Sequence, residues 1–226
     1  MLERHKLVWL SDEGWQAARA DAAESTRNAI ALWQHSGFPA VVRRVESDAG
    51  EGVVCAGIAL PPDAQGRKQR IPLRVAHAHV RAASVPLPLE QVLPALPGHW
   101  QAALGLLVAE AGAQRISFRV YGSAALQVLT GMTYLTTDSD IDLLFQPASR
   151  AQLNTGLLLL ARYARTIPLD GEILFPCGSA VAWKEWVAAI ASPGNPRVLV
   201  KDMRRVRLAS VNELLHKLED EPCTSH

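Results

Sequence analysis

The sequence is poor in cysteine, and it has no cysteine or histidine pair at the spacing of a zinc site. Its three cysteines, in 226 residues, are far apart and odd in number: Cys55, Cys177 and Cys223. The absence of a CxxC pair argues against structural zinc, and an odd, scattered set argues against a disulfide framework. We therefore expect a protein of a reducing compartment, and the cytoplasm is the predicted location.

Long apolar runs and an excess of one charge are also missing. The longest apolar run, GLLLLARYA, contains an arginine and is too short to cross a bilayer, and MLERHKLVWL lacks the features of a signal peptide. The 23 basic and 22 acidic side chains leave a formal net charge of +1. Proteins that bind long nucleic acid usually carry a clustered basic excess. We therefore expect neither a membrane protein nor a long nucleic-acid partner, whereas a small phosphorylated substrate needs only a few cations.

The sequence contains both helical and strand patterns, and their order along the chain differs before and after about residue 90. The first part has a helix-forming segment followed by three β-branched segments, which predict a small antiparallel meander: 11–37, 38–44, 52–60 and 70–76. The next segment, SVPLPLEQVLPALPGHW (84–100), is rich in proline and poor in regular pattern. We place a division there, between an α+β domain at 1–90 and a second domain at 91–226.

The second part alternates helices and strands. Helices are predicted at 100–112, 123–131, 150–165, 180–191 and 211–220, and strands at 116–122, 140–145, 170–176 and 197–202. The fold class predicted for the whole chain is therefore α+β.

A Gly-Ser turn follows the strand ISFRVYG and opens the helix at 123–131. A strand that turns directly into a helix aims the first N–H groups of the helix beyond the strand end, where they favour phosphate oxygens. Glycine at 122 lets the backbone approach a ligand closely. Gly122 and Ser123 are therefore predicted to bind substrate phosphates, although a Gly-Ser pair is also a common helix cap.

Asp140 and Asp142 stand two positions apart in the segment DIDLLF, so a strand would present both carboxylates on one face. Two neighbouring carboxylates repel unless a cation lies between them. Mg²⁺ is such a cation, and it prefers carboxylate and phosphate oxygens. The alternative is a solvated pair at a sheet edge, but the apolar residues around it, Ile141, Leu143 and Leu144, favour an inner strand. We predict a site for Mg²⁺ or Mn²⁺ at Asp140 and Asp142.

A third carboxylate is expected from a neighbouring strand. The segment LDGEILF offers Asp170 and Glu172 on one face, and alternation cannot choose between them. Glu172 lies further into the apolar strand and is slightly favoured, while Asp170 remains open. Among the later cations, Lys201 at the end of a predicted core strand is the best candidate to assist the phosphates.

This constellation of a Gly-Ser turn, a DxD strand and a later acidic strand resembles the nucleotidyltransferase superfamily of the DNA polymerase β type over about residues 100–205. The resemblance implies a mixed sheet flanked by helices, with a smaller α+β domain in front of it. With metal bound, such a site activates an attacking hydroxyl and neutralises a leaving diphosphate.

A more specific resemblance extends over nearly the full chain. The segments HKLVWL, GFPAVVRR, YGSAALQVLTGMTYLTTDSDIDLLF, LDGEILFP and AVAWKEW are similar to the malonate decarboxylase holo-acyl-carrier-protein synthases, which are phosphoribosyl-dephospho-CoA transferases. This resemblance implies transfer of 2′-(5″-phosphoribosyl)-3′-dephospho-CoA from its 5″-triphosphate precursor to a serine of the acyl carrier protein, with release of diphosphate. The catalytic carboxylates of that family map onto Asp140 and Asp142.

Two other functions are compatible with the same residues. One is a nucleotidyltransferase that uses ATP or CTP on another small-molecule or protein acceptor. The other is a non-catalytic nucleotide-binding module, which is less favoured because the turn and the acidic pair are both intact. Residues 1–90 lie outside the nucleotidyltransferase-like part of the sequence. By elimination, we assign them to donor specificity or to docking of the carrier protein.

Overall fold

The computed structural model describes residues 2–194 and 196–218, so Cys223 and the last residues of the predicted helix 211–220 lie outside the described part. These residues form two compact units. Unit 1 comprises residues 1–86 and 126–137, and unit 2 comprises residues 87–125 and 138–226. Each unit combines helices with its own sheet, which confirms the predicted α+β class.

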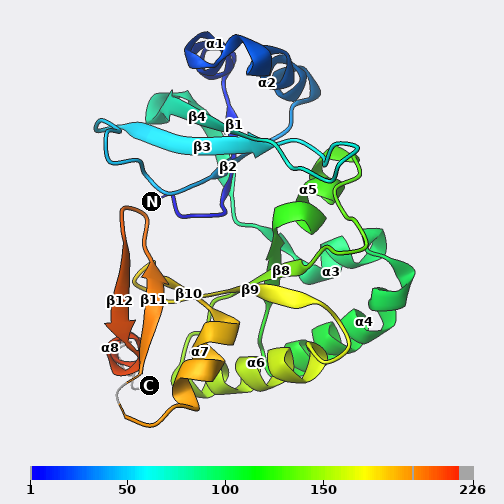
Figure 1. Ribbon diagram of the computed structural model, residues 1–226, viewed down its shortest axis with the longest axis vertical. Helices are drawn as coiled ribbons and strands as arrows, with labels where there is room; N and C mark the ends of the chain where they lie inside the picture. Colours follow the sequence, from blue (N-terminus) through cyan, green and yellow to red (C-terminus); the bar gives the residue numbers. More distant parts are fainter. Residues whose placement is uncertain (1, 195, 219–226) are drawn as a thin grey trace, which may run out of the picture. The chain divides into compact units, whose positions relative to one another are not determined.

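Unit 1 is built on a five-stranded antiparallel sheet with the strand order β4-β3-β2-β1-β5. Its strands are β1 (Leu7–Leu10), β2 (Ala40–Val42), β3 (Val53–Ala59), β4 (Arg70–Ala76) and β5 (Val80–Ser84), with a 3₁₀ turn, His77–His79, before β5. The helices α1 (Asp12–Asp21) and α2 (Glu24–Ser36) lie together against this sheet (Figure 1). The predicted antiparallel meander of three strands is confirmed as β2, β3 and β4.

Alternation along β4 explains why this sheet has one apolar face. Ile71, Leu73 and Val75 are each only 2% exposed, whereas the residues between them are exposed. Side chains of a strand point alternately to the two faces, so this pattern buries one side only. Ile30 and Trp33 of α2 are fully buried, and the indole N–H of Trp33 donates to the carbonyl of Pro39 at 3.3 Å.

A distant segment, residues 126–137, completes unit 1. Tyr134 is 1% exposed, and its hydroxyl donates to the carbonyl of Ala59 in β3 at 2.7 Å. The side-chain oxygen of Gln127 accepts from the N–H groups of Tyr134 and Leu135, both at 3.1 Å, which fixes the loop that carries the tyrosine. Burial raises the pKa of Tyr134 to about 12.

Unit 2 is built on a seven-stranded mixed sheet with the order β12-β11-β10-β9-β8-β7-β6. Its strands are β6 (Leu87–Pro88), β7 (Phe118–Tyr121), β8 (Ile141–Phe145), β9 (Leu169–Leu174), β10 (Ala180–Ala182), β11 (Arg197–Lys201) and β12 (Val206–Ser210). Its helices are α3 (Leu89–Val92), α4 (Gly98–Ala113), the start of α5 (Gly122–Thr130), α6 (Arg150–Tyr163), α7 (Trp183–Ile190) and α8 (Val211–His216). Only the β8–β9 pair is parallel among these described strands, and α6 makes the crossover between them.

The helices α4, α6 and α7 cover one face of the unit 2 sheet (Figure 1). Helix α6 approaches β8 at Gly156, where an added Cβ would lie 2.3 Å from the ring of Phe145. Leu153 and Leu160, one turn to either side, are 0% and 1% exposed. The close approach at Gly156 therefore seats the crossover helix directly on the strand that carries Asp142.

Two predicted elements differ from the structure, and a strand was missed. The predicted helix 11–37 is two helices, because Ala22 and Ala23 adopt extended ψ angles of 150° and 141°. The predicted helix 180–191 begins only at Trp183, because residues 180–182 pair with β9 as strand β10. Strand β12 was not predicted. None of the helices in the described part of the chain is long and apolar enough to cross a membrane.

Candidate functional site

The turn between β7 and α5 lies directly against the carboxylate of Asp142. Gly122 has a φ of +67°, and a Cβ added there would lie 2.2 Å from Oδ2 of Asp142. Only glycine leaves room for the carboxylate at this backbone conformation. Ser123 follows as the second residue of α5 and is half-buried. The structure thus brings together the predicted phosphate-binding turn and one of the two predicted metal ligands.

The register of the central strands places a second carboxylate beside Asp142. Across the parallel β8–β9 ladder Asp142 pairs with Asp170, and across the antiparallel β7–β8 ladder it pairs with Tyr121. Registered partners on neighbouring strands share a face of the sheet and lie about 5 Å apart. Asp142 and Asp170 are both half-buried, so their carboxylates can reach a common ligand.

Asp140 lies one residue before β8, not within it, and is exposed. The expectation that Asp140 and Asp142 alternate along one strand is therefore wrong in this detail. Asp140 still lies at the same end of β8 as Asp142, where the backbone N–H of Ile141 donates to the carbonyl of Pro168 at 2.8 Å.

Glu172 and Lys201 form an ion pair with each other. Glu172 is 4% exposed, and its Oε1 accepts from the Lys201 ammonium at 2.8 Å. Glu172 pairs in register with Leu144 of β8 and not with Asp142. A buried carboxylate is stable as an ion when a cation neutralises it. The two residues lie on the same sheet face as Asp142 and Asp170, but one step further along β9.

Gly171, between the two acidic residues of β9, is a site residue that the sequence analysis missed. Its φ is +128°, and an added Cβ would lie 1.9 Å from the carbonyl oxygen of Leu143. Glycine is required here because β9 approaches the β8 backbone too closely for any side chain. The available signal was a lone glycine inside an apolar strand, which often marks a close backbone approach.

A cation lies beside Asp170. The Lys184 ammonium, in the first turn of α7, is 3.6 Å from Oδ1 of Asp170. The lysine and aspartate side chains are 53% and 43% exposed, so solvent screens the pair and it contributes little to stability. Lys184 therefore places a solvent-exposed cation beside the Asp170 carboxylate, and its ammonium also lies 5.8 Å from the centroid of the Trp183 ring.

The donor set matches the coordination habit of magnesium. Mg²⁺ is usually held by one or two carboxylates together with substrate phosphates, not by a cage of protein ligands. Asp142 and Asp170 offer two carboxylate groups on adjacent strands, and the turn at Gly122 lies against the first of them. Among residues 2–194 and 196–218, no group of three or more His, Cys, Asp or Glu is arranged to hold a metal ion.

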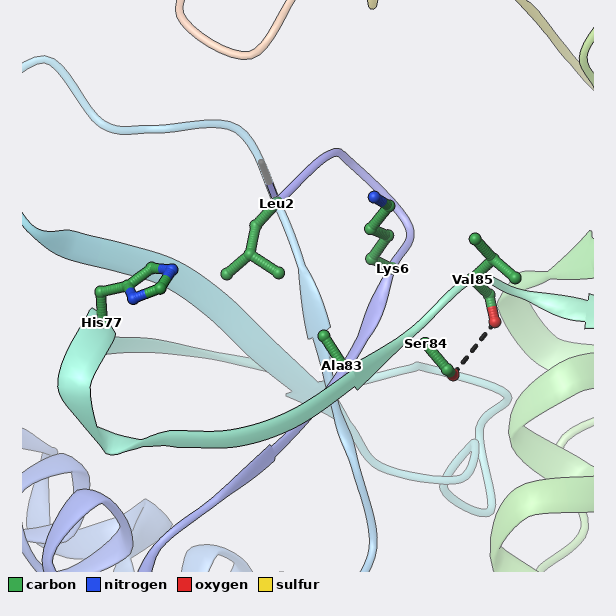
Figure 2. A pocket seen from close by; sticks show the side chains of 6 residues that line it. All are labelled: Leu2, Lys6, His77, Ala83, Ser84 and Val85. Atoms are coloured by element: carbon green, nitrogen blue, oxygen red, sulfur yellow. Dashed lines mark hydrogen bonds between the residues drawn. The ribbon is translucent and has the colours of Figure 1, made fainter.

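Two hollows in unit 1 contain none of the predicted site residues. One has a volume of about 300 Å³ and is lined by Leu2, Lys6, His77, Ala83, Ser84 and Val85. Figure 2 shows Leu2 and Lys6 on the N-terminal segment facing His77 and the end of β5. The other, of about 280 Å³, has Arg43, Arg70 and Arg74 in its wall together with Glu46.

Comparison with known families divides the chain into two matched segments. Residues 3–86 match the model of the phosphoribosyl-dephospho-CoA transferase MdcG N-terminal domain. Residues 88–212 match the model of the phosphoribosyl-dephospho-CoA transferase MdcG C-terminal domain. The second match contains all the predicted site residues, and it ends two residues after β12.

Individual relatives are similar over most of their length. A phosphoribosyl-dephospho-CoA transferase of Xanthomonas euvesicatoria is 37% identical over 92% of this chain and 94% of its own. One from Xanthomonas campestris is 40% identical over 82% and 86%, and one from Bradyrhizobium diazoefficiens is 34% identical over 94% and 92%. No solved structure shows a significant match.

Proposed function

Because the chain belongs to the phosphoribosyl-dephospho-CoA transferase family, as its family and full-length matches show, we propose the following reaction for it. The protein is a transferase that moves 2′-(5″-phosphoribosyl)-3′-dephospho-CoA from its 5″-triphosphate precursor to a serine of the malonate decarboxylase acyl carrier protein. The serine hydroxyl loses its proton to solvent and its oxygen forms a bond to the α-phosphorus of the precursor. The bond from that phosphorus to the oxygen of the β-phosphate breaks, and diphosphate leaves. The observation that carries the proposal is the registered pair Asp142–Asp170 beside the Gly122 turn.

Each residue of this cluster has a task that its position supports. Gly122 and Ser123 hold the phosphates that leave, since the N-terminus of α5 favours negative charge. Lys184, at 3.6 Å from Asp170, neutralises part of the charge on the phosphates. Glu172 is held in an ion pair by Lys201, so in this proposal Asp170, and not Glu172, is the carboxylate that works with Asp142.

Magnesium or manganese fits the carboxylate pair. Asp142 and Asp170 would hold it, with Asp140 at the exposed end of β8 as a further oxygen donor. A bound metal ion would stabilise the charge that develops on the transferred and leaving phosphates. The arrangement of a Gly-Ser turn, acidic β8 and acidic β9 also supports a nucleotidyltransferase-like organisation of unit 2.

The test uses the purified protein, the apo carrier protein and the triphosphoribosyl donor. We expect the carrier to gain the mass of the prosthetic group, with one diphosphate released per carrier, only when Mg²⁺ or Mn²⁺ is present. Asp142→Asn and Asp170→Asn should each lower kcat at least about 100-fold, as loss of a charge-stabilising group does. Glu90→Gln, an exposed carboxylate of α3, is the matched control and should keep wild-type activity.

Two results would point elsewhere. If the carrier is labelled from ATP or CTP instead of the triphosphoribosyl donor, the protein is a nucleotidyltransferase with another donor. If the donor binds in calorimetry but neither diphosphate nor labelled carrier forms with any metal, the protein is a binding module. Wild-type labelling by both Asp142→Asn and Asp170→Asn would remove these carboxylates from the mechanism.

A further inference from the structure

The hairpin formed by β11 and β12 has an exposed apolar face. Leu199, Val206 and Leu208 are 38%, 42% and 52% exposed, while Val198 and Val200 on the opposite face are fully buried. Leu199 pairs in register with Leu208, and Lys201 pairs with Val206, so the three apolar side chains share one face. Adjacent apolar side chains at an exposed surface are typical of a protein interaction site.

This face is continuous with the candidate site. The Lys201 ammonium reaches across β10 to Glu172 at 2.8 Å, and Ala180 of β10 pairs in register with Lys201. Glu172 lies two residues from Asp170 on β9, and therefore on the same face. Strands are spaced by about 4.8 Å, so the four steps from β8 to β12 span roughly 19 Å. A small protein domain docked on the hairpin would cover that distance.

The hairpin is also the place where positive charge gathers. Residues 197–210 contain five basic residues and one acidic residue, whereas the whole chain has 23 and 22. Lys201 is paired with Glu172, and Arg207 with Glu213 at 2.7 Å. Three further arginines are exposed: Arg197 at the start of β11, which donates to the Leu208 carbonyl at 3.0 Å, and Arg204 and Arg205 in the turn, where Arg205 lies 3.6 Å from the Asp202 carboxylate. An apolar patch rimmed by arginines complements a partner with apolar side chains surrounded by carboxylates.

We infer that this face, defined by Leu199, Val206 and Leu208 with the rim Arg197, Arg204 and Arg205, is the docking surface for the protein acceptor. The inference rests on the proposed function, because it takes the acceptor to be a protein that presents a serine. The acceptor surface next to that serine is acidic with an apolar centre. Docking on the hairpin delivers the serine to the phosphate held near Asp142 and Asp170.

The experiment changes the docking surface and leaves the carboxylate cluster intact. The variants are Leu208→Asp and the double charge reversal Arg204→Glu with Arg205→Glu. Two matched controls, the α6 controls, lie across the sheet: Leu158→Asp on α6, whose leucine is 73% exposed, and Arg165→Glu in the turn that follows α6, which is also exposed. We expect the KM for apo carrier protein to rise at least about tenfold in the hairpin variants. The charge reversal should also reduce the dependence of this KM on salt concentration more than Leu208→Asp does.

Other readouts should remain unchanged in the hairpin variants. The KM for the donor, and the slow release of diphosphate to water without carrier, should stay within about twofold of the wild-type values. The α6 controls should keep the wild-type KM for the carrier. An unchanged carrier KM in both hairpin variants would overturn the inference. An unchanged carrier KM together with a lower free energy of unfolding would show that another part of this chain covers the face. An unchanged carrier KM together with loss of a dimer would show that a second copy of the chain covers it.

Calorimetric titration of apo carrier protein into each variant separates this inference from the proposed function. If the wild-type protein binds the carrier without labelling it, the proposed reaction fails and binding by the variants still decides the docking surface. Weaker binding by the hairpin variants alone supports the inference. If the wild-type protein neither binds nor labels the carrier, both proposals fall.

Discussion

Glycines with a positive φ serve different purposes beside the strand that carries Asp142 and in turns away from it. In unit 1, Gly66 has a φ of +77° in the loop before β4, and nothing lies within 4 Å of the position that a Cβ would take. In unit 2, Gly122 and Gly171 also have positive φ angles, of +67° and +128°. An added Cβ at these positions would lie 2.2 Å from Asp142 and 1.9 Å from Leu143, respectively. Gly66, like Gly178 and Gly194 of unit 2, has an open Cβ position, whereas Gly122 and Gly171 bring the backbone close to the strand that carries Asp142.

The largest expected effect is that of Gly171→Ala. The new Cβ would overlap the Leu143 carbonyl, so β8 and β9 must separate where Asp142 and Asp170 are paired. We expect a loss of about 3–5 kcal/mol in the free energy of unfolding, from strain and overpacking together. Gly66→Ala meets no atom and should cost only about 1–2 kcal/mol. Urea unfolding measures both, and equal losses would contradict the distinction between blocked and open glycine positions.

Gly122→Ala should act on the reaction more than on stability. Its Cβ would displace the Asp142 carboxylate, and a displacement of about 1 Å at a reacting centre can cost about 100-fold in rate. Gly131→Ala is the matched control, because Gly131 has a φ of +71° just after the end of α5 with nothing within 4 Å. Diphosphate release measures the rate. Equal rate losses in the two variants would show that the contact with Asp142 is unimportant.

The smallest effect is expected in unit 1, for Tyr134→Phe. Removing the hydroxyl that donates to Ala59 should cost about 1 kcal/mol at neutral pH. Burial raises the pKa of Tyr134 to about 12 from its ordinary value of 10, so its contribution is complete below pH 10 and is lost as pH rises toward 12. The difference in unfolding free energy between wild type and variant should therefore shrink over that range. A constant difference in denaturant titrations from pH 9 to 12 would contradict this assignment.

The sequence predicted the fold class and most elements because apolar periodicity is local. It could not predict β10, since Ala180 to Ala182 have no strand signature of their own and become a strand through pairing with β9. It could not predict the break between α1 and α2 either, because Ala22 and Ala23 are good helix formers whose extended conformation is set by the tertiary structure. In both cases distant contacts override local propensity.

The candidate site was predicted in its parts but not in its pairings. The acidic residues of β8 and β9 are visible as motifs, whereas the register that sets Asp170, and not Glu172, opposite Asp142 is a property of two strands together. The ion pair of Glu172 with Lys201 joins residues on strands that are not sheet neighbours, so no spacing in the sequence indicates it. The roles of all these residues stay predictions.

Because of the segment 126–137, the two units do not coincide with the two family matches. The two family matches meet between residues 86 and 88, yet unit 1 is completed by a piece of chain from inside the second match. A chimaera that joins residues 1–86 of one relative to residues 87–226 of another would give the Ala59 carbonyl a foreign counterpart of Tyr134. A division of the chain at residue 87 therefore separates Tyr134 from the sheet to which its hydroxyl donates, even though each side has a family model of its own.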